Sequence, residues 1–115
     1  MNDDMSAPNN NIVHKKQDLT QYLYEIGALW SYKINSDTVL PDRELIAKSL
    51  TYLELEDMWM LWDIYSEEYI RKVWEEDMLP QNEAYMGITN RIVAYVLFHV
   101  KDYETYKIQV CGRMD

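Results

Sequence analysis

Residues 82–100 read NEAYMGITNRIVAYVLFHV, and this stretch does most to decide the fold class. Asn82 belongs to the residue types that cap helix N-termini. One face then follows at helical steps, made by Tyr85, Ile88, Ile92, Val96 and His99. Arg91 lies on the other face, but Val93, Tyr95, Leu97 and Phe98 make the segment apolar almost all round. We therefore expect a long helix that is the central and most buried one. A strand over Ile92–Phe98 is the competing interpretation, because Val and Ile favour strands.

Helical signals also precede this segment. A stripe with helical spacing begins after Asp18 and comprises Leu19, Tyr22, Leu23, Ile26, Leu29 and Trp30. Pro41 suits a first helical turn, and the helix it opens should bury Leu45, Ile46, Ser49, Leu50 and Leu53. A short helix through Leu55–Tyr65 and another from Ser66 to about Leu79 should follow, separated by the possible N-cap Ser66. Residues 102–109 fit either one more helical turn or a short extended segment.

These signals predict an all-α protein, a compact bundle of about five short to medium helices in a single domain over residues 17–115. Residues 1–16 carry no apolar periodicity and are expected to form a disordered tail. With 115 residues, 48% of them hydrophobic, one core can form without disulfides or metal. Cys111 is the only cysteine, so neither an intramolecular disulfide nor a cysteine-based zinc site is expected. No secretory signal or membrane span is evident, which predicts a cytoplasmic protein.

The charge balance indicates the kind of partner. Twenty acidic side chains oppose eleven basic ones, for a net charge of −9. Such a chain repels phosphate backbones and anionic membrane surfaces, so nucleic acid and membranes are disfavoured as partners. A basic protein surface is the natural complement. A homo-oligomer is left open.

Motifs for catalysis or cofactors are not apparent. His14 and His99 are too far apart to form a helical metal pair, so no metal site is predicted. The glycines are isolated, which removes phosphate-binding loops, and no serine occupies a nucleophile elbow. We predict no cofactor and no enzymatic activity. Two carboxylate pairs, Asp63 with Glu67 and Glu68 with Glu75, have a spacing that would permit acid–base chemistry, although adjacent acids are usually a solvated helix face.

The most distinctive segment is Glu54–Asp77. It holds nine acidic residues and only two basic ones, Arg71 and Lys72, so it carries −7 of the chain's −9. Aromatic residues alternate with the acids, and aromatics often anchor interfaces while charges steer the approach of a partner. The predicted partner-binding residues are Trp59, Asp63, Glu67, Glu68, Glu75 and Glu76. Trp59 stands about 100° from the line of Met58, Trp62 and Tyr65, which makes it the best candidate for an exposed aromatic. The alternative is that Trp59 belongs to the core.

An ordered pattern of residues resembles a known family. The pattern comprises Leu29-Trp30, Leu40-Pro41-Asp42, Leu45-Ile46, Leu50, Tyr52, Leu55-Glu56-Asp57, Leu61, Tyr65, Ile70, Trp74 and Leu79. It resembles a poorly characterised family of small helical bacterial proteins often encoded beside nucleotidyltransferase-like toxins of abortive-infection systems. Relatives typically carry a glycine before the second helix of the pair, where this chain has Leu53. The resemblance implies an antitoxin-like neutraliser and supplies no catalytic residue.

Residues and resemblance together predict a non-enzymatic protein-interaction module, an antitoxin-like neutraliser or partner of a basic protein. A helix-turn-helix DNA-binding regulator is the alternative, since two short consecutive helices span Leu55–Asp77. Its would-be recognition helix carries Glu67, Glu68, Glu75, Glu76 and Asp77, which would repel phosphates. A small enzyme with an unrecognised site is the third interpretation.

Overall fold

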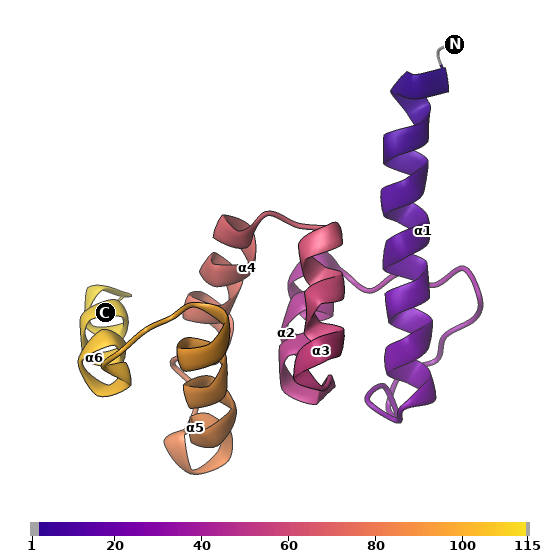
Figure 1. Cartoon of the computed structure of the whole chain (residues 1–115). Coiled ribbons are helices and arrows are strands. Elements are labelled where there is room, and N and C mark those ends of the chain that lie inside the picture. The colour runs from indigo at the N-terminus through magenta and orange to yellow at the C-terminus, as the bar shows by residue number, and fades with distance from the viewer. Residues whose placement is uncertain (1–2, 115) are drawn as a thin grey trace. The chain divides into compact units, whose positions relative to one another are not determined.

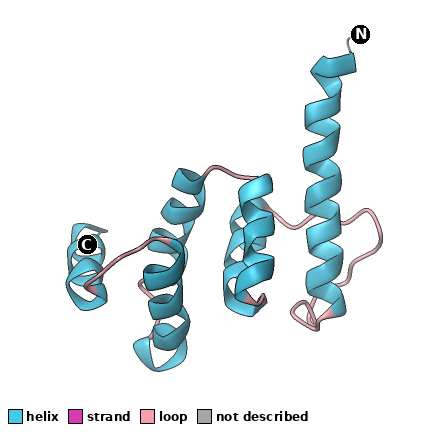
Figure 2. Cartoon of the chain, viewed as in Figure 1, coloured by secondary structure: helices cyan, strands magenta, loops and turns pink. Residues whose placement is uncertain are grey.

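The fold was analysed in a computed structural model, which describes residues 3–114 and the side chains of residues 11–112. Helices and loops make up the described residues, with no strand among them (Figure 2), so the predicted all-α class is confirmed and the strand over Ile92–Phe98 is not formed. The α-helices are α1 (Asp3–Glu25), α2 (Asp42–Tyr52), α3 (Leu55–Met58), α4 (Glu67–Val73), α5 (Glu83–Ile92) and α6 (Tyr103–Met114), labelled in Figure 1. The chain divides into two compact units, Met1–Ser66 and Glu67–Asp115. Each is described by itself.

In the first unit, α2 forms as the sequence predicts. All five residues of the expected stripe are buried: Leu45, Ile46, Ser49, Leu50 and Leu53. The helix follows Pro41, with acidic residues in its first turn where they complement the helix dipole. Helix α3 continues into a 3₁₀ turn, Trp59–Asp63, and buries Met58 and Leu61.

Helix α1 differs from the expectation at both ends. It begins at Asp3, so residues 3–16 are helical where the sequence predicts a disordered tail. At the end of this stretch, the ammonium of Lys16 lies 3.0 Å from a carboxylate oxygen of Asp42 and over the ring of Tyr65. These polar contacts join residues distant in the sequence, so no periodic pattern predicts them.

At its C-terminal end, α1 stops at Glu25 and the chain turns through Gly27, whose φ is 88°. The N–H of Ala28 donates to the carbonyl of Leu23 and that of Gly27 to the carbonyl of Tyr24, the bonding pattern of a Schellman cap. This turn breaks the helical period. Ile26 and Trp30, which the predicted stripe places in the core, are therefore exposed.

In the second unit, two helices are extended by π-helical turns and a third is longer than expected. Helix α4 continues through Trp74–Met78 and α5 through Val93–Leu97. Residues 103–109 belong to α6, a full helix that begins just after Asp102, rather than a short turn or extended segment. Trp74 lies at the centre of this core, fully buried, with the rings of Phe98 and Tyr106 at 5.2 and 5.9 Å. Asn82 caps α5 as predicted, accepting from the N–H of Ala84 at 2.7 Å.

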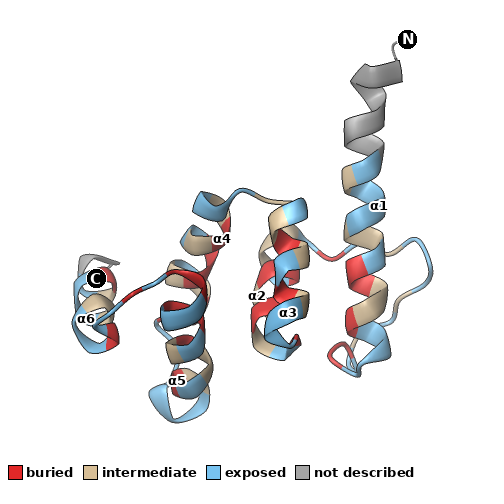
Figure 3. Cartoon of the chain, in the orientation of Figure 1, coloured by how far each residue is buried: buried red, intermediate tan, exposed pale blue. Residues whose placement is uncertain are grey.

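Helix α5 buries one face only, although the sequence predicts that it is the central and most buried helix. Tyr85, Ile88, Ile92, Val96 and His99 are exposed. The buried positions of α5 and its π-turn are Gly87, Asn90, Val93, Ala94 and Leu97, and Figure 3 shows α5 with both buried and exposed segments. The buried amide of Asn90 is satisfied by two hydrogen bonds. The expectation that α5 is the most buried helix was therefore wrong for the face that carries Tyr85, Ile88 and Ile92.

Candidate functional site

Trp59 is an exposed aromatic in the first unit, as its helical angle predicts. It is 49% exposed, whereas its neighbour Met58 is buried. Its ring meets that of Trp62 at 4.9 Å with an interplanar angle of 58°. Asp63 ends the same 3₁₀ turn and is exposed. A partly exposed indole held by a second indole, with acids on both sides in the sequence, is a geometry suited to binding a partner.

Other acids of the first unit are engaged inside it. Asp57 accepts a hydrogen bond from the hydroxyl of Tyr22 at 2.9 Å, and this bond raises the pKa of the Tyr22 phenol. Asp42 accepts one from the hydroxyl of Tyr65 at 2.6 Å. That bond and the ammonium of Lys16 lower the pKa of the Asp42 carboxyl. These groups hold the unit together, whereas Glu54 and Glu56 remain exposed near Trp59.

The predicted acids of the second unit are not equivalent. Glu67 and Glu68 are exposed in the first turn of α4, and Glu76 is exposed in its π-turn. Glu75 accepts a hydrogen bond from the hydroxyl of Tyr106, and its carboxylate lies 3.5 Å from Nε of Arg71. Glu75 is thus engaged within the second unit.

The six predicted residues are divided between the two units. Trp59 and Asp63 belong to the first, and the four glutamates belong to the second. The structure brings Trp59 and Asp63 together on one short turn, and it brings Glu67 and Glu68 together at the start of α4. Each pair is a local feature of its own unit.

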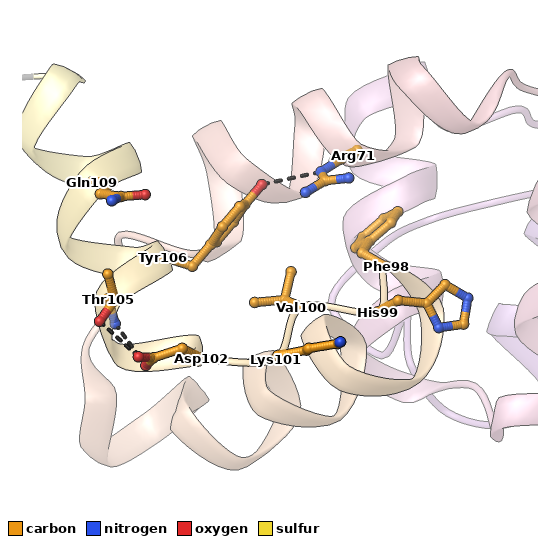
Figure 4. A pocket seen from close by; sticks show the side chains of 9 residues that line it. All are labelled: Arg71, Phe98, His99, Val100, Lys101, Asp102, Thr105, Tyr106 and Gln109. Carbon is orange, nitrogen blue, oxygen red and sulfur yellow. Dashed lines mark hydrogen bonds between the residues drawn. The ribbon is translucent and has the colours of Figure 1, made fainter.

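A hollow of about 290 Å³ lies in the second unit (Figure 4). On one side, Nε of Arg71 donates to the hydroxyl of Tyr106 at 3.0 Å, and the guanidinium lies 5.5 and 5.3 Å from the rings of Phe98 and Tyr106. His99 lines the hollow with a φ of 57°, a left-handed backbone uncommon outside glycine. The hollow combines a cationic group with aromatic walls, and no local sequence pattern predicts it because Arg71 and Tyr106 are 35 residues apart.

The polar groups of the hollow serve structural roles. Asp102 caps α6, accepting from the N–H of Thr105 at 3.1 Å and from its hydroxyl at 2.9 Å, and these bonds lower the pKa of the Asp102 carboxyl. Burial and the bond to Glu75 raise the pKa of the Tyr106 phenol, so it stays protonated at neutral pH. Such a phenol cannot act as a general base. Arg71 and Tyr106 are best understood as joining α6 to α4.

Within the described residues, no cluster of three or more His, Cys, Asp or Glu side chains is arranged to hold a metal ion. None of the described helices is long and apolar enough to cross a membrane. Comparison of the chain with family models, with curated proteins and with solved structures finds no match.

Proposed function

We propose that this chain is a non-enzymatic protein-interaction module that binds a basic protein through Trp59 and nearby acids, as an antitoxin-like neutraliser in a bacterial cytoplasm would. The observation that carries the proposal is the half-exposed Trp59, which the exposed acids Glu54 and Glu56 precede in the sequence and the exposed Asp63 follows. An indole left half in water is available to fill a pocket on a partner. The acids around it select a partner of opposite charge.

Two physical roles are assigned to these groups. A buried aromatic at an interface typically contributes 2 kcal/mol or more and acts mainly on the dissociation rate. Exposed carboxylates act over about 10 Å at 0.1 M salt and therefore mainly raise the association rate. Glu67, Glu68 and Glu76 add exposed negative charge in the second unit and are assigned the steering role. Asp63 serves beside Trp59.

The test begins with proteins and nucleic acids captured at low salt by the immobilised chain, followed by purification of the protein that binds. Association and dissociation rates are then measured against salt concentration. Raising the salt should slow association more than it speeds dissociation. Trp59→Ala should weaken affinity on the order of thirtyfold through the dissociation rate, whereas the loss of its ring contact with Trp62 should lower the melting temperature by only a few degrees.

Matched variants keep the test specific. Trp30 is 85% exposed, lies in the same unit and is remote from the acidic segment in the sequence, so Trp30→Ala should leave the affinity unchanged. The pair Glu67→Lys and Glu68→Lys should change association, whereas Asp37→Lys in the exposed loop before α2 should change it less. Equal effects of the two tryptophan variants would contradict the proposal. Capture of DNA in place of a protein would favour the regulator interpretation.

A further inference from the structure

Helix α5 and its π-turn expose an apolar face, here called the α5 stripe and defined by Tyr85, Ile88, Ile92 and Tyr95. Tyr85 is 87% exposed and Ile88 77%, and the other two are each at least 40% exposed. Val96 beside them is also exposed. Single apolar residues are common on protein surfaces, but a continuous row along one helix marks an interaction site. The opposite face of the same helix is already packed in the core of the second unit.

The spacing along the α5 stripe is that of a helix–helix seam. Its members follow one another at steps of three, four and three residues, which are the a and d positions of two heptads. When two such helices pair antiparallel, an a position meets a d position of the other helix. Tyr85 would then meet Tyr95 of the second copy, and Ile88 would meet Ile92. The stripe is therefore complementary to itself.

The charges beside the α5 stripe cancel one another. Arg91 binds both Glu83 and Glu104, the latter at 2.5 Å, and Lys107 binds Glu83 at 2.6 Å. Two acids and two bases thus neutralise one another within the second unit. A basic partner would find no unpaired acid in this group to attract it. Two acidic copies could approach here without local repulsion, although each carries −9 overall.

We propose that the α5 stripe is the interface of a symmetric homodimer in which α5 of one copy packs antiparallel against α5 of another. The stripe and Val96 expose at most roughly 600 Å² at ordinary side-chain areas, compared with the ~800 Å² that each partner contributes to a standard interface, so a dimer formed here lies at the small end of stable interfaces. The two-fold axis passes between Ile88 and Ile92. This interface uses a different surface from the one proposed above for a basic protein, so the two proposals can fail separately.

The first test measures the mass of the full chain by sedimentation equilibrium over a range of concentrations. The native chain should be a dimer at micromolar concentrations. Ile88→Lys should weaken dimerisation on the order of thirtyfold or more, because it places a charge at the centre of the seam. Val13→Lys replaces a half-exposed β-branched residue on α1 in the other unit and should leave the dimer intact. Tyr85→Ser, at the most exposed position of the stripe, repeats the test if Ile88→Lys alters the circular dichroism spectrum.

The second test fixes the orientation by cross-linking. In a Cys111→Ser background, copies carrying Ile88→Cys are mixed with copies carrying Ile92→Cys and oxidised. The mixture should form a disulfide-linked dimer faster than either variant alone, since each new thiol faces the other position. Faster linkage of Ile88→Cys with itself would overturn the antiparallel arrangement. A native chain that stays monomeric at 100 μM or more, or an Ile88→Lys variant that dimerises like the native chain, would overturn the interface itself.

Discussion

Removing the side chain of Asn90 should lower the stability of the second unit by a large amount for so small a side chain. It is fully buried, its Oδ1 accepts from Nε1 of Trp74 at 3.1 Å, and its Nδ2 donates to the carbonyl of Met78 at 3.1 Å. Asn90→Ala would leave the buried N–H of Trp74 without this partner, at about 1–3 kcal/mol. The carbonyl of Met78 keeps its bond from the N–H of Gln81, so its loss adds little. The void left by the amide adds about 1 kcal/mol.

The expected total is about 2–4 kcal/mol of unfolding free energy, which corresponds to a melting temperature lowered by roughly 10–20 °C. Thermal and urea unfolding, followed by circular dichroism, measure it. Ser49→Ala is the matched control, because Ser49 is equally buried but its hydroxyl has no hydrogen-bond partner among the described residues. That variant should be neutral or slightly stabilising. If Asn90→Ala costs no more than Ser49→Ala, or if a double-mutant cycle with Trp74→Phe gives a coupling near zero, the assigned hydrogen bond is not stabilising the core.

Two further predictions concern acid stability and backbone conformation. The Tyr65 hydroxyl and Lys16 lower the pKa of the Asp42 carboxyl in the folded protein. The stability that Asp42 contributes is therefore complete above its unfolded-state pKa of about 4, and it is lost as the pH falls through the lower folded-state pKa. Below about pH 4, the melting temperature of Asp42→Asn should depend less on pH than that of the native chain. Gly27→Ala should destabilise the protein by about 1 kcal/mol, because the φ of Gly27 is 88° even though the space around it is open. Gly112→Ala, in α6, should stabilise the protein by up to about 1 kcal/mol. The melting temperatures of the two variants should therefore shift in opposite directions.

Local signals in the sequence were sufficient for much of the fold. The α2 stripe, its start after Pro41 and the cap at Asn82 depend on residues within one or two turns of each other, and the structure has all three. The ion pair between Lys16 and Asp42 and the clamp between Arg71 and Tyr106 are polar contacts between distant residues. Such contacts leave no periodic pattern, so no inspection of a single sequence could supply them.

The candidate site was predictable to a similar extent. The exposure of Trp59 followed from its angle on a short helix, because the neighbours that define that angle are local. The hydrogen bond that engages Glu75 could not be predicted in this way, since its donor is Tyr106, which is 31 residues away. A row of acids in a sequence therefore gives the charge of a segment, but the fold decides which carboxylates are left to meet a partner.

The exposed apolar face of α5 bears on its role. Periodicity predicts that a row of large apolar residues is covered by something, but not by what. In α5 and its π-turn the buried positions include Gly87, Asn90 and Ala94, and Asn90 is held by hydrogen bonds to Trp74 and to the carbonyl of Met78. The larger Ile88 and Ile92 are left on the other side. Ile88 is 77% exposed and Ile92 40%, so neither fills the core as fully as the residues on the opposite face. Their spacing, at steps typical of a helix–helix seam, is the feature on which the proposed α5 homodimer rests.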